Sequence, residues 1–279
     1  MIGTIPARVA TLLTATLATV AVLAWASASA GASITYTPIY SNIPSPLPGN
    51  VPSEAIEATS SSEFGGEVQL AGPTLNSTKV TVALSSWACQ SGGAEDGSCV
   101  SAKGAKFEWP VTLHIYTAGT GDSVGTQVAS LTKTFKMPYR PSANAACSGP
   151  VHLGGWMRMG QCYHGKLFKI TFALKGVTIP SKAIVSVAFN TTDYGAEPTH
   201  VPGPYDSLNV GGFEGAPSVG SDPQPQSDYI NSLWTGAYCD EGLAGTGSFR
   251  FDPALPSCVG PSDNFDNEGL QPGITVATG

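Results

Sequence analysis

Charged side chains are scarce in this chain of 279 residues, and basic ones are the scarcest. Lys and Arg number 13 against 20 Asp and Glu, and the four types together make up 12% of the sequence. A chain so poor in cations lacks the basic face that nucleic-acid-binding proteins present to phosphates. It also lacks the run of Lys and Arg that holds proteins to anionic lipids. We therefore expect neither nucleic acid nor a membrane surface among the partners of the mature protein.

The familiar catalytic motifs are missing as well. There is no H-E-x-x-H zinc helix and no Walker loop. Glycoside hydrolysis needs two carboxylates that flank the scissile bond. Here Glu67 and Glu108 only border predicted strands, and most other acids fall in predicted loops. The sequence favours a protein that is not an enzyme and leaves catalysis open as an alternative.

Only one long apolar run occurs, and it lies close to the N-terminus. Arg8 is followed by apolar or small residues as far as Trp25, and then by alternating Ala and Ser up to Ala30. This order of basic residue, apolar core and small-residue end is typical of a secretory signal peptide. An uncleaved membrane anchor is the alternative, because a run of about 17 residues is near the lower limit for spanning a bilayer, but the small-residue end favours cleavage. We expect residues 1–30 to be removed after Ala30 and the protein to be secreted, either free or at the cell surface.

All six cysteines follow this segment, and their even number in an exported chain predicts disulfides. The simplest pairing is sequential: Cys89–Cys99, Cys147–Cys162 and Cys239–Cys258. Closely spaced pairs of the C-x2-C kind are absent, so a zinc site is not expected. Asp263, Asp266 and Glu268 form an oxygen-rich group that would suit a structural Ca²⁺, although the spacing is not that of an EF-hand. We expect no other cofactor.

Gly and Pro are abundant, at 33 and 22 residues. Between them, alternating apolar residues predict strands at 79–87, 110–117, 127–137, 167–174 and 183–189, with shorter ones at 67–71, 229–234, 248–251 and 274–277. No amphipathic helix pattern is present. Short strands joined by turn-rich segments predict an all-β protein, an antiparallel β-sandwich of jelly-roll type stapled by disulfides. Residues 31–55 read as an extended, Pro-rich entry segment, and residues 56–279 as a single sandwich domain.

Two long stretches lack a strand pattern, 138–166 and 191–228, and long loops often carry binding residues. In the first stretch, Trp156 and Tyr163 lie beside His152 and Arg158. Exposed aromatic rings with polar neighbours suit a sugar, so these four residues form the predicted binding site. The remaining tryptophans that lie near strand patterns are expected to pack in the core or at a sheet edge. They are Trp87, Trp109 and Trp234.

Several segments resemble a group of uncharacterised secreted bacterial proteins of surface type. The segments are 41–53 (SNIPSPLPGNVPS), 57–72 (EATSSSEFGGEVQLAG), 80–92 (VTVALSSWACQSG), 137–142 (MPYRPS), 205–211 (YDSLNVG) and 245–252 (GTGSFRFD). They are spread over most of residues 41–258. The group has no assigned activity, so the resemblance implies export and a β-rich surface module, without any site residues.

These observations give one main hypothesis and two alternatives. The main hypothesis is a secreted β-sandwich that binds a carbohydrate or another cell-surface component. The first alternative is a secreted hydrolase acting on glycans, and the second is a purely structural envelope protein. Burial of Trp156 would remove the predicted binding loop from consideration, because a sugar needs an open ring face.

Overall fold

The computed structural model describes residues 1, 3, 34–94, 96–149, 152–189, 208–254 and 271–279. The chain divides into two units, Met1–Ile34 and Thr35–Gly279. The predicted signal peptide falls almost wholly outside the described residues. Within the described part, no helix has the length and apolar character needed to cross a bilayer.

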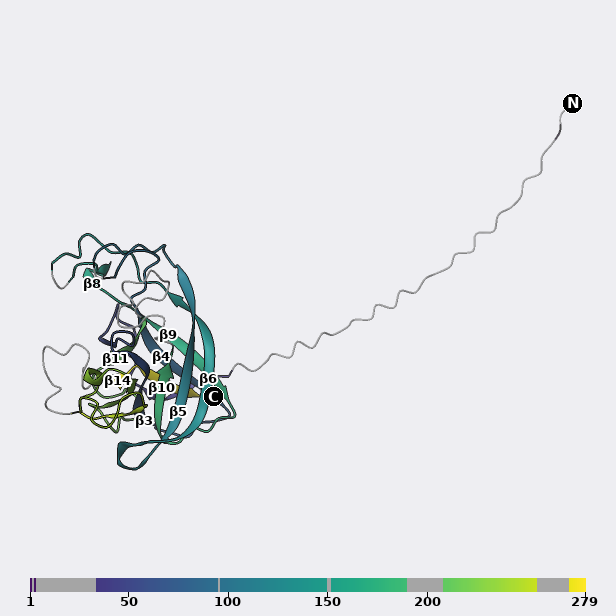
Figure 1. Cartoon of the computed structure of the whole chain (residues 1–279). Helices are drawn as coiled ribbons and strands as arrows, with labels where there is room; N and C mark the ends of the chain where they lie inside the picture. The colour runs from purple at the N-terminus through teal and green to yellow at the C-terminus, as the bar shows by residue number, and fades with distance from the viewer. Residues whose placement is uncertain (2, 4–33, 95, 150–151, 190–207, 255–270) are drawn as a thin grey trace. The chain divides into compact units, whose positions relative to one another are not determined.

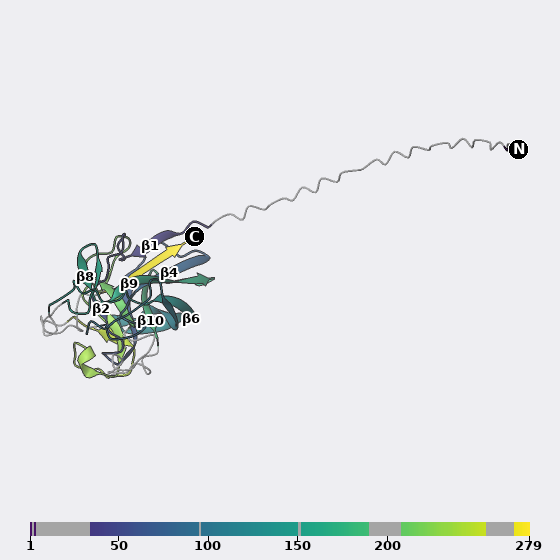
Figure 2. The same cartoon turned by 90° about the horizontal axis from the view of Figure 1, so that it is seen from above.

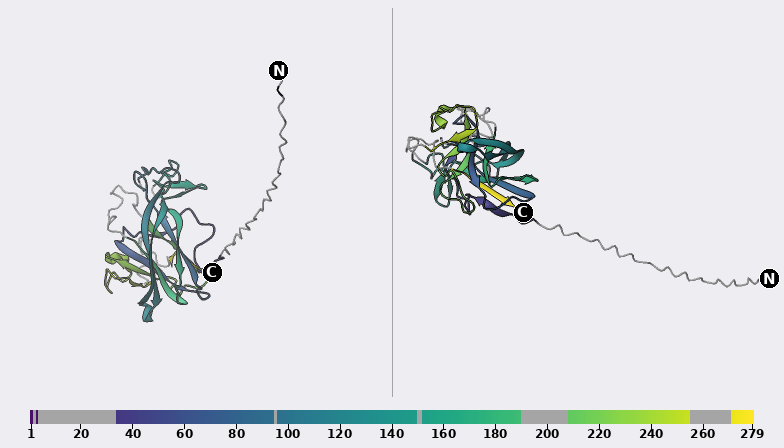
Figure 3. Two further views of the ribbon diagram at one scale, coloured as in Figure 1. Left: turned by 90° about the vertical axis from the view of Figure 1, so that its right-hand side faces the viewer. Right: turned by 90° about the horizontal axis from the view of Figure 1, so that it is seen from below.

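The second unit contains two antiparallel sheets, and the first of them has seven strands. Its main path runs β1 (Thr37–Ser41), β15 (Ile274–Thr278), β4 (Ser77–Ser86), β11 (Leu208–Phe213) and β14 (Gln271–Pro272). Strand β9 (Lys166–Lys175) also pairs with β4, and β2 (Ser53–Glu54) pairs with β11. Figure 2 shows the yellow strand β15 between β1 and β4, and the right panel of Figure 3 shows it beside the purple β1.

The second sheet has six strands, in the order β13 (Arg250–Asp252), β12 (Asp228–Ser232), β3 (Ser61–Gln69), β10 (Lys182–Ala188), β5 (Lys106–Ala118) and β6 (Val124–Pro138). A separate hairpin of β7 (Trp156–Arg158) and β8 (Gln161–Tyr163) lies at one end of the second unit, as Figure 1 shows. Short 3-10 turns occur at Thr120–Asp122 and Thr235–Ala237.

The main core lies between the two sheets and follows from the alternation along their strands. Val80 and Val82 of β4 belong to the same buried cluster as Leu113 and Ile115 of β5. Each such side chain contributes about 1.5–3 kcal/mol when it is withdrawn from water. The intervening residues of both strands face outward, as a period of two requires. The all-β antiparallel fold predicted from the sequence is therefore confirmed, together with strands close to the predicted ranges.

Strand β11 lies where the sequence predicts none, and β3 begins six residues before the strand predicted at 67–71. Strand β11 contains Gly211 and Gly212, and β3 contains Gly65 and Gly66, so both segments look like turns in the sequence. The glycines are needed because other chain segments come close to them. A Cβ atom on Gly65 would lie 2.5 Å from Ser186 Cβ, and one on Gly211 would lie 2.9 Å from Leu167 Cδ1. Glycine here permits close strand packing rather than a turn.

The Pro-rich entry segment belongs to the folded unit from Thr35 onward. Pro38 lies in β1, an edge strand, where a missing backbone donor is tolerated. Further along, Ile43, Leu47 and Val51 pack against Ala83 and Leu167 on the outer face of the seven-stranded sheet. The segment thus covers the part of this face around Ala83 and Leu167.

Candidate functional site

The outer face of the six-stranded sheet carries a buried polar group centred on Glu63. Glu63 Oε1 lies 2.9 Å from His114 Nδ1 and accepts hydrogen bonds from the hydroxyls of Tyr116, at 3.0 Å, and Ser186, at 2.5 Å. His114 and Tyr116 of β5 share the face opposite the core, because Leu113 and Ile115 point into it. Three strands, β3, β5 and β10, supply this group.

A second carboxylate, Glu67, lies four residues further along β3 on the same face. Its Oε1 forms an ion pair with Lys182 Nζ at 2.6 Å, and its Oε2 accepts a hydrogen bond from the Tyr229 hydroxyl at 3.1 Å. Burial raises the pKa of Tyr229, and the negative charge of Glu67 raises it further. Burial and the charge of Glu63 act in the same way on the pKa of Tyr116. Both tyrosines therefore remain protonated donors to a carboxylate.

This face holds Ser, His and Glu side chains, yet their geometry is not that of a catalytic triad. In a triad the imidazole lies between the serine and the acid and takes the serine proton. Here the Ser186 hydroxyl donates directly to Glu63, and Ser186 is buried. This group therefore does not activate Ser186 as a nucleophile.

Residues 233–249 connect β12 to β13, and we call them the cap; its last residue, Phe249, lies against this polar face. The ring centre of Phe249 lies 5.4 Å from that of Tyr116 and 6.1 Å from that of Tyr229. Asp240 binds Arg250 through two hydrogen bonds, of 2.8 and 2.9 Å, and the Arg250 guanidinium lies 3.8 Å above the ring centre of Tyr238. The hydrogen bond from Arg250 lowers the pKa of Asp240. The cap is thus fixed to the strands that flank it.

Trp234, at the start of the cap, is exposed, with 44% of its surface open to solvent. A Cβ atom on Gly236 would lie 2.8 Å from Trp234 Cζ2, so the indole lies directly against the backbone there. The Trp234 amide donates to the buried Ser232 hydroxyl at 2.9 Å, and the Ser232 amide donates to the Tyr238 hydroxyl at 2.8 Å. The exposure of Trp234 contradicts the packing role expected for it. The structure instead presents an exposed indole ring on a backbone that these hydrogen bonds hold in place.

The predicted binding residues lie in and before the β7–β8 hairpin, and the structure brings Trp156, Tyr163 and Arg158 together there. Trp156 is only 7% exposed, and its Nε1 donates to the Gly165 carbonyl at 2.8 Å. It therefore offers no open ring face for a sugar. His152 and Arg158 are exposed, and Arg158 donates to the Pro48 carbonyl at 3.1 Å.

The entry segment packs against one side of this hairpin. A Cβ atom on Gly49 would lie 2.5 Å from the Tyr163 ring, so the backbone at Gly49 packs directly on that side chain. The Tyr163 ring centre lies 5.5 Å from that of Trp156. The contact joins residues more than a hundred positions apart, which a local sequence pattern does not show.

The predicted disulfides Cys89–Cys99 and Cys147–Cys162 are confirmed. Cys239 is disulfide-bonded too, and its predicted partner Cys258 lies outside the described residues.

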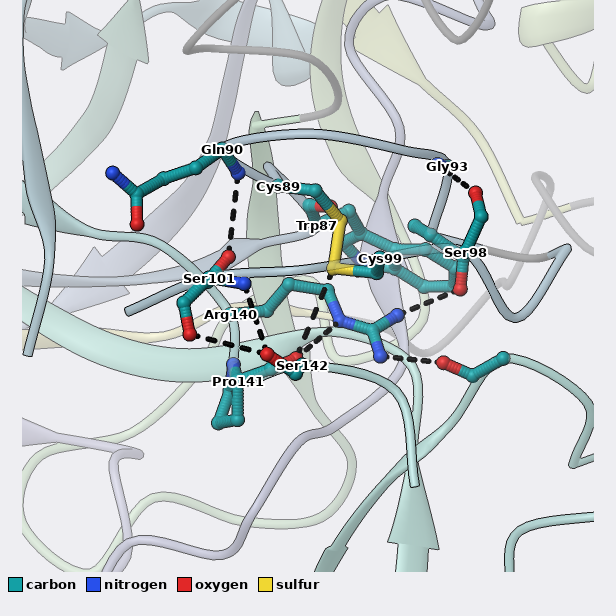
Figure 4. The surroundings of a disulfide bond; sticks show 12 residues. Trp87, Cys89, Gln90, Gly93, Ser98, Cys99, Ser101, Arg140, Pro141 and Ser142 are labelled. Carbon is teal, nitrogen blue, oxygen red and sulfur yellow. Dashed lines mark hydrogen bonds between the residues drawn. A yellow bond between two sulfur atoms is a disulfide. The ribbon is translucent and has the colours of Figure 1, made fainter. Parts of the chain in front are cut away.

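The first two disulfide loops are joined by Arg140, which is fully buried. Its Nη1 donates to the Ala94 carbonyl at 2.7 Å, and its Nη2 donates to the Gly154 carbonyl. Figure 4 shows this guanidinium next to the Cys89–Cys99 disulfide.

A cavity of about 630 Å³ lies near the polar face, and Glu214 and Asp222 are among its lining residues. Burial raises the pKa of Asp222 to about 6, and the charge of Glu67 contributes in the same direction. The Asp222 carboxylate accepts a hydrogen bond from the Gln224 backbone amide at 2.8 Å.

The predicted calcium ligands Asp263, Asp266 and Glu268 lie outside the described residues. Within the described part, no three His, Cys, Asp or Glu side chains gather as a metal site would require.

The candidate site is therefore the cap with Trp234 and the polar face beneath Phe249, rather than the loop around Trp156. The sequence signal for Trp234 was present, because it starts a Gly-rich segment, but its nearness to a predicted strand suggested packing. No family model, curated protein or solved structure matches this chain, so its function is inferred from the geometry of the site.

Proposed function

We propose that this protein is a secreted β-sandwich module that binds carbohydrate, with Trp234 as the aromatic platform. The observation that carries the proposal is the exposed indole held against Gly236. An aromatic ring offers a large apolar surface at a low entropic cost, and a support fixed in advance lowers that cost further. The C–H groups of a sugar ring would pack against the open face of the indole.

Three other features of the chain support an extracellular role. The disulfides Cys89–Cys99 and Cys147–Cys162 are typical of an oxidising compartment. The apolar segment that ends at Ala30 has the pattern of a cleaved leader. Resemblance to secreted bacterial proteins of surface type points the same way, and polysaccharides are abundant in that setting.

The test is a glycan-array screen of the mature protein, followed by titration of any ligand found. Trp234→Ala should weaken binding about 30-fold or more, since a central tryptophan in an interface contributes about 2 kcal/mol or more. Trp234→Phe should retain part of the affinity because it keeps a ring. Leu243→Ala is the matched control, because Leu243 is an exposed apolar residue of the same cap.

Equal binding by wild type and Trp234→Ala would contradict the platform role, provided that the variant unfolds at the wild-type urea concentration. A screen without any glycan ligand would favour the structural envelope alternative.

The hydrolase alternative has one observation in its favour. Glu63 and Glu67 project from one face of β3, and two carboxylates are the groups that glycoside hydrolysis uses. Both are buried and hydrogen-bonded in this structure, which is why binding is the better-supported function. Release of new reducing ends from a bound glycan by the wild type, abolished in Glu63→Gln, would establish the hydrolase.

A further inference from the structure

The positive charge of this acidic chain is concentrated in one part of the sequence. No Asp or Glu occurs between Asp122 and Asp193, whereas eight of the 13 Lys and Arg residues fall in that interval. The interval includes β6 and β9, which are edge strands of the two different sheets. Lys133 of β6 reaches across to β9, where its Nζ lies 3.4 Å from the Thr171 carbonyl oxygen. The two edges therefore lie side by side.

Four lysines gather around this junction, and we call them the lysine patch. Lys169 and Lys175 lie on the outer face of β9, and Lys79 lies on the same face of the adjacent β4. The register pairs Lys79 with Ala173, so Lys79 is diagonal to Lys175 on neighbouring strands. Lys133 completes the group from β6. The outer-face residues that lie between these lysines on β4 and β9 are small: Thr81, Thr171 and Ala173.

Among the described residues, no carboxylate forms an ion pair with the patch. The ion pairs of lysine there join Lys136 to Glu108 and Lys182 to Glu67. Lys133, Lys169 and Lys175 are exposed. The ammonium of Lys79 lies 3.8 Å above the ring centre of Tyr36, which holds it in place without cancelling its charge. The patch thus gathers positive charge locally, whereas the chain as a whole has a net charge of −7.

We propose that the lysine patch binds an anionic polysaccharide, one that carries carboxylate or sulfate groups along an extended chain. Lys169 and Lys175 are six residues apart on one strand, which corresponds to about 20 Å. A single small anion cannot contact both ends of the patch, whereas the spaced charges of a polymer can. The flat outer face of a sheet also suits an extended chain better than a compact ligand.

This surface is separate from the cap. Strand β12, which leads into the cap, and strand β6 are far apart in the order of the six-stranded sheet. The patch can therefore bind a polymer whether or not Trp234 binds a sugar, and the two proposals can fail independently. A nucleic acid offers the same spaced negative charge, but the acidic remainder of the molecule would repel its larger and denser charge.

The experiment measures binding to polygalacturonate by titration, with neutral dextran and duplex DNA as the other probes, at about 50 mM and about 500 mM NaCl. Wild type should bind polygalacturonate at the lower salt concentration and lose most of the affinity at the higher one. The double variant Lys169→Glu/Lys175→Glu should lose at least about tenfold in affinity for polygalacturonate. The control Lys103→Glu/Lys136→Glu has the same change in net charge outside the patch, and it should keep the wild-type affinity.

Trp234→Ala should also keep its affinity for polygalacturonate, which separates this proposal from the platform role of Trp234. The proposal is overturned if wild type ignores polygalacturonate, or if both double variants lose affinity equally. Tighter binding of duplex DNA than of polygalacturonate would overturn it in favour of a nucleic-acid surface. Equal binding of neutral dextran and polygalacturonate by Trp234→Ala, which lacks the platform ring, would show that charge does not govern binding at the patch and would overturn the proposal too.

Discussion

At the scale of single residues, Arg140 shows how one buried side chain can organise two loops. Its guanidinium contacts backbone carbonyls of the loops that the two described disulfides close, and its own amide donates to the Ala88 carbonyl at 3.0 Å. Burial lowers the pKa of Arg140 to about 10, so it is still charged at neutral pH. The carbonyl dipoles take the place of a carboxylate partner.

Replacing Arg140 by Met should destabilise the fold strongly. The variant keeps an unbranched apolar stem but leaves buried carbonyls without a donor, and each costs about 1–3 kcal/mol. We expect the free energy of unfolding, measured in urea, to fall by about 3 kcal/mol or more. Arg158→Met, at an exposed position, should change it by less than about 1 kcal/mol. Similar losses in the two variants would contradict the role assigned to Arg140.

At the scale of elements, the alternation of apolar and polar residues was enough to predict most of the long strands. Strands that contain glycine pairs, and contacts between distant segments, could not be predicted in this way. Strands β4, β5, β9 and β10 show a clear period of two, because one face of each is apolar. Strand β3 was only partly predicted, since its Gly65-Gly66 pair resembles a turn. Glu63 was missed as a site residue for the same reason.

The candidate site was harder to predict than the fold because exposure depends on distant chain segments. Trp156 is buried by the turn of chain around Gly165 and by the Gly49 contact on Tyr163. Trp234 is exposed because the chain turns at Gly236 immediately after β12. Neither fact follows from the residues next to each tryptophan.

The Cys147–Cys162 loop is the element whose stability depends most on a covalent link. It contains the β7 strand and closes 15 residues of separation with little regular structure. Cys147→Ser/Cys162→Ser should lower the free energy of unfolding by about 3 kcal/mol, because the unfolded chain regains the freedom of that loop. Amide exchange in residues 144–163 should also become faster. Unchanged stability and unchanged exchange would show that packing alone holds the hairpin.

At the scale of the whole molecule, acidic and basic residues are segregated along the sequence. Stability should depend on pH in the range where buried carboxyl groups titrate. The folded pKa of Asp222, about 6, lies above its ordinary value of 3.8 because burial disfavours the charged form. Between these two values the folded state holds the proton more tightly than the unfolded state does. The contribution of Asp222 to stability therefore falls as the pH rises from about 4 to about 6, and then stays constant.

Asp222→Asn should remove this part of the pH dependence while keeping an oxygen for the Gln224 amide. Relative to wild type, the variant should gain stability between pH 4 and pH 6.5, as measured by urea unfolding at a series of pH values. Asp240→Asn is an informative comparison, since the pKa of Asp240 is lowered by Arg250 and its trend has the opposite sign. Parallel pH curves for wild type and Asp222→Asn would rule out the raised pKa.

The position of β15 has a consequence for the order of assembly. Strand β15 pairs with β1 on one side and with β4 on the other, so residues 274–278 fill a place inside the sheet. Thr37 pairs with Thr278, which joins two positions separated by nearly the whole length of the chain. This sheet stays incomplete until residues 274–278 have joined it, and contacts between such distant positions form slowly. Until then the place between β1 and β4 is empty, so the edges of both strands that face β15 have no hydrogen-bonding partner from it.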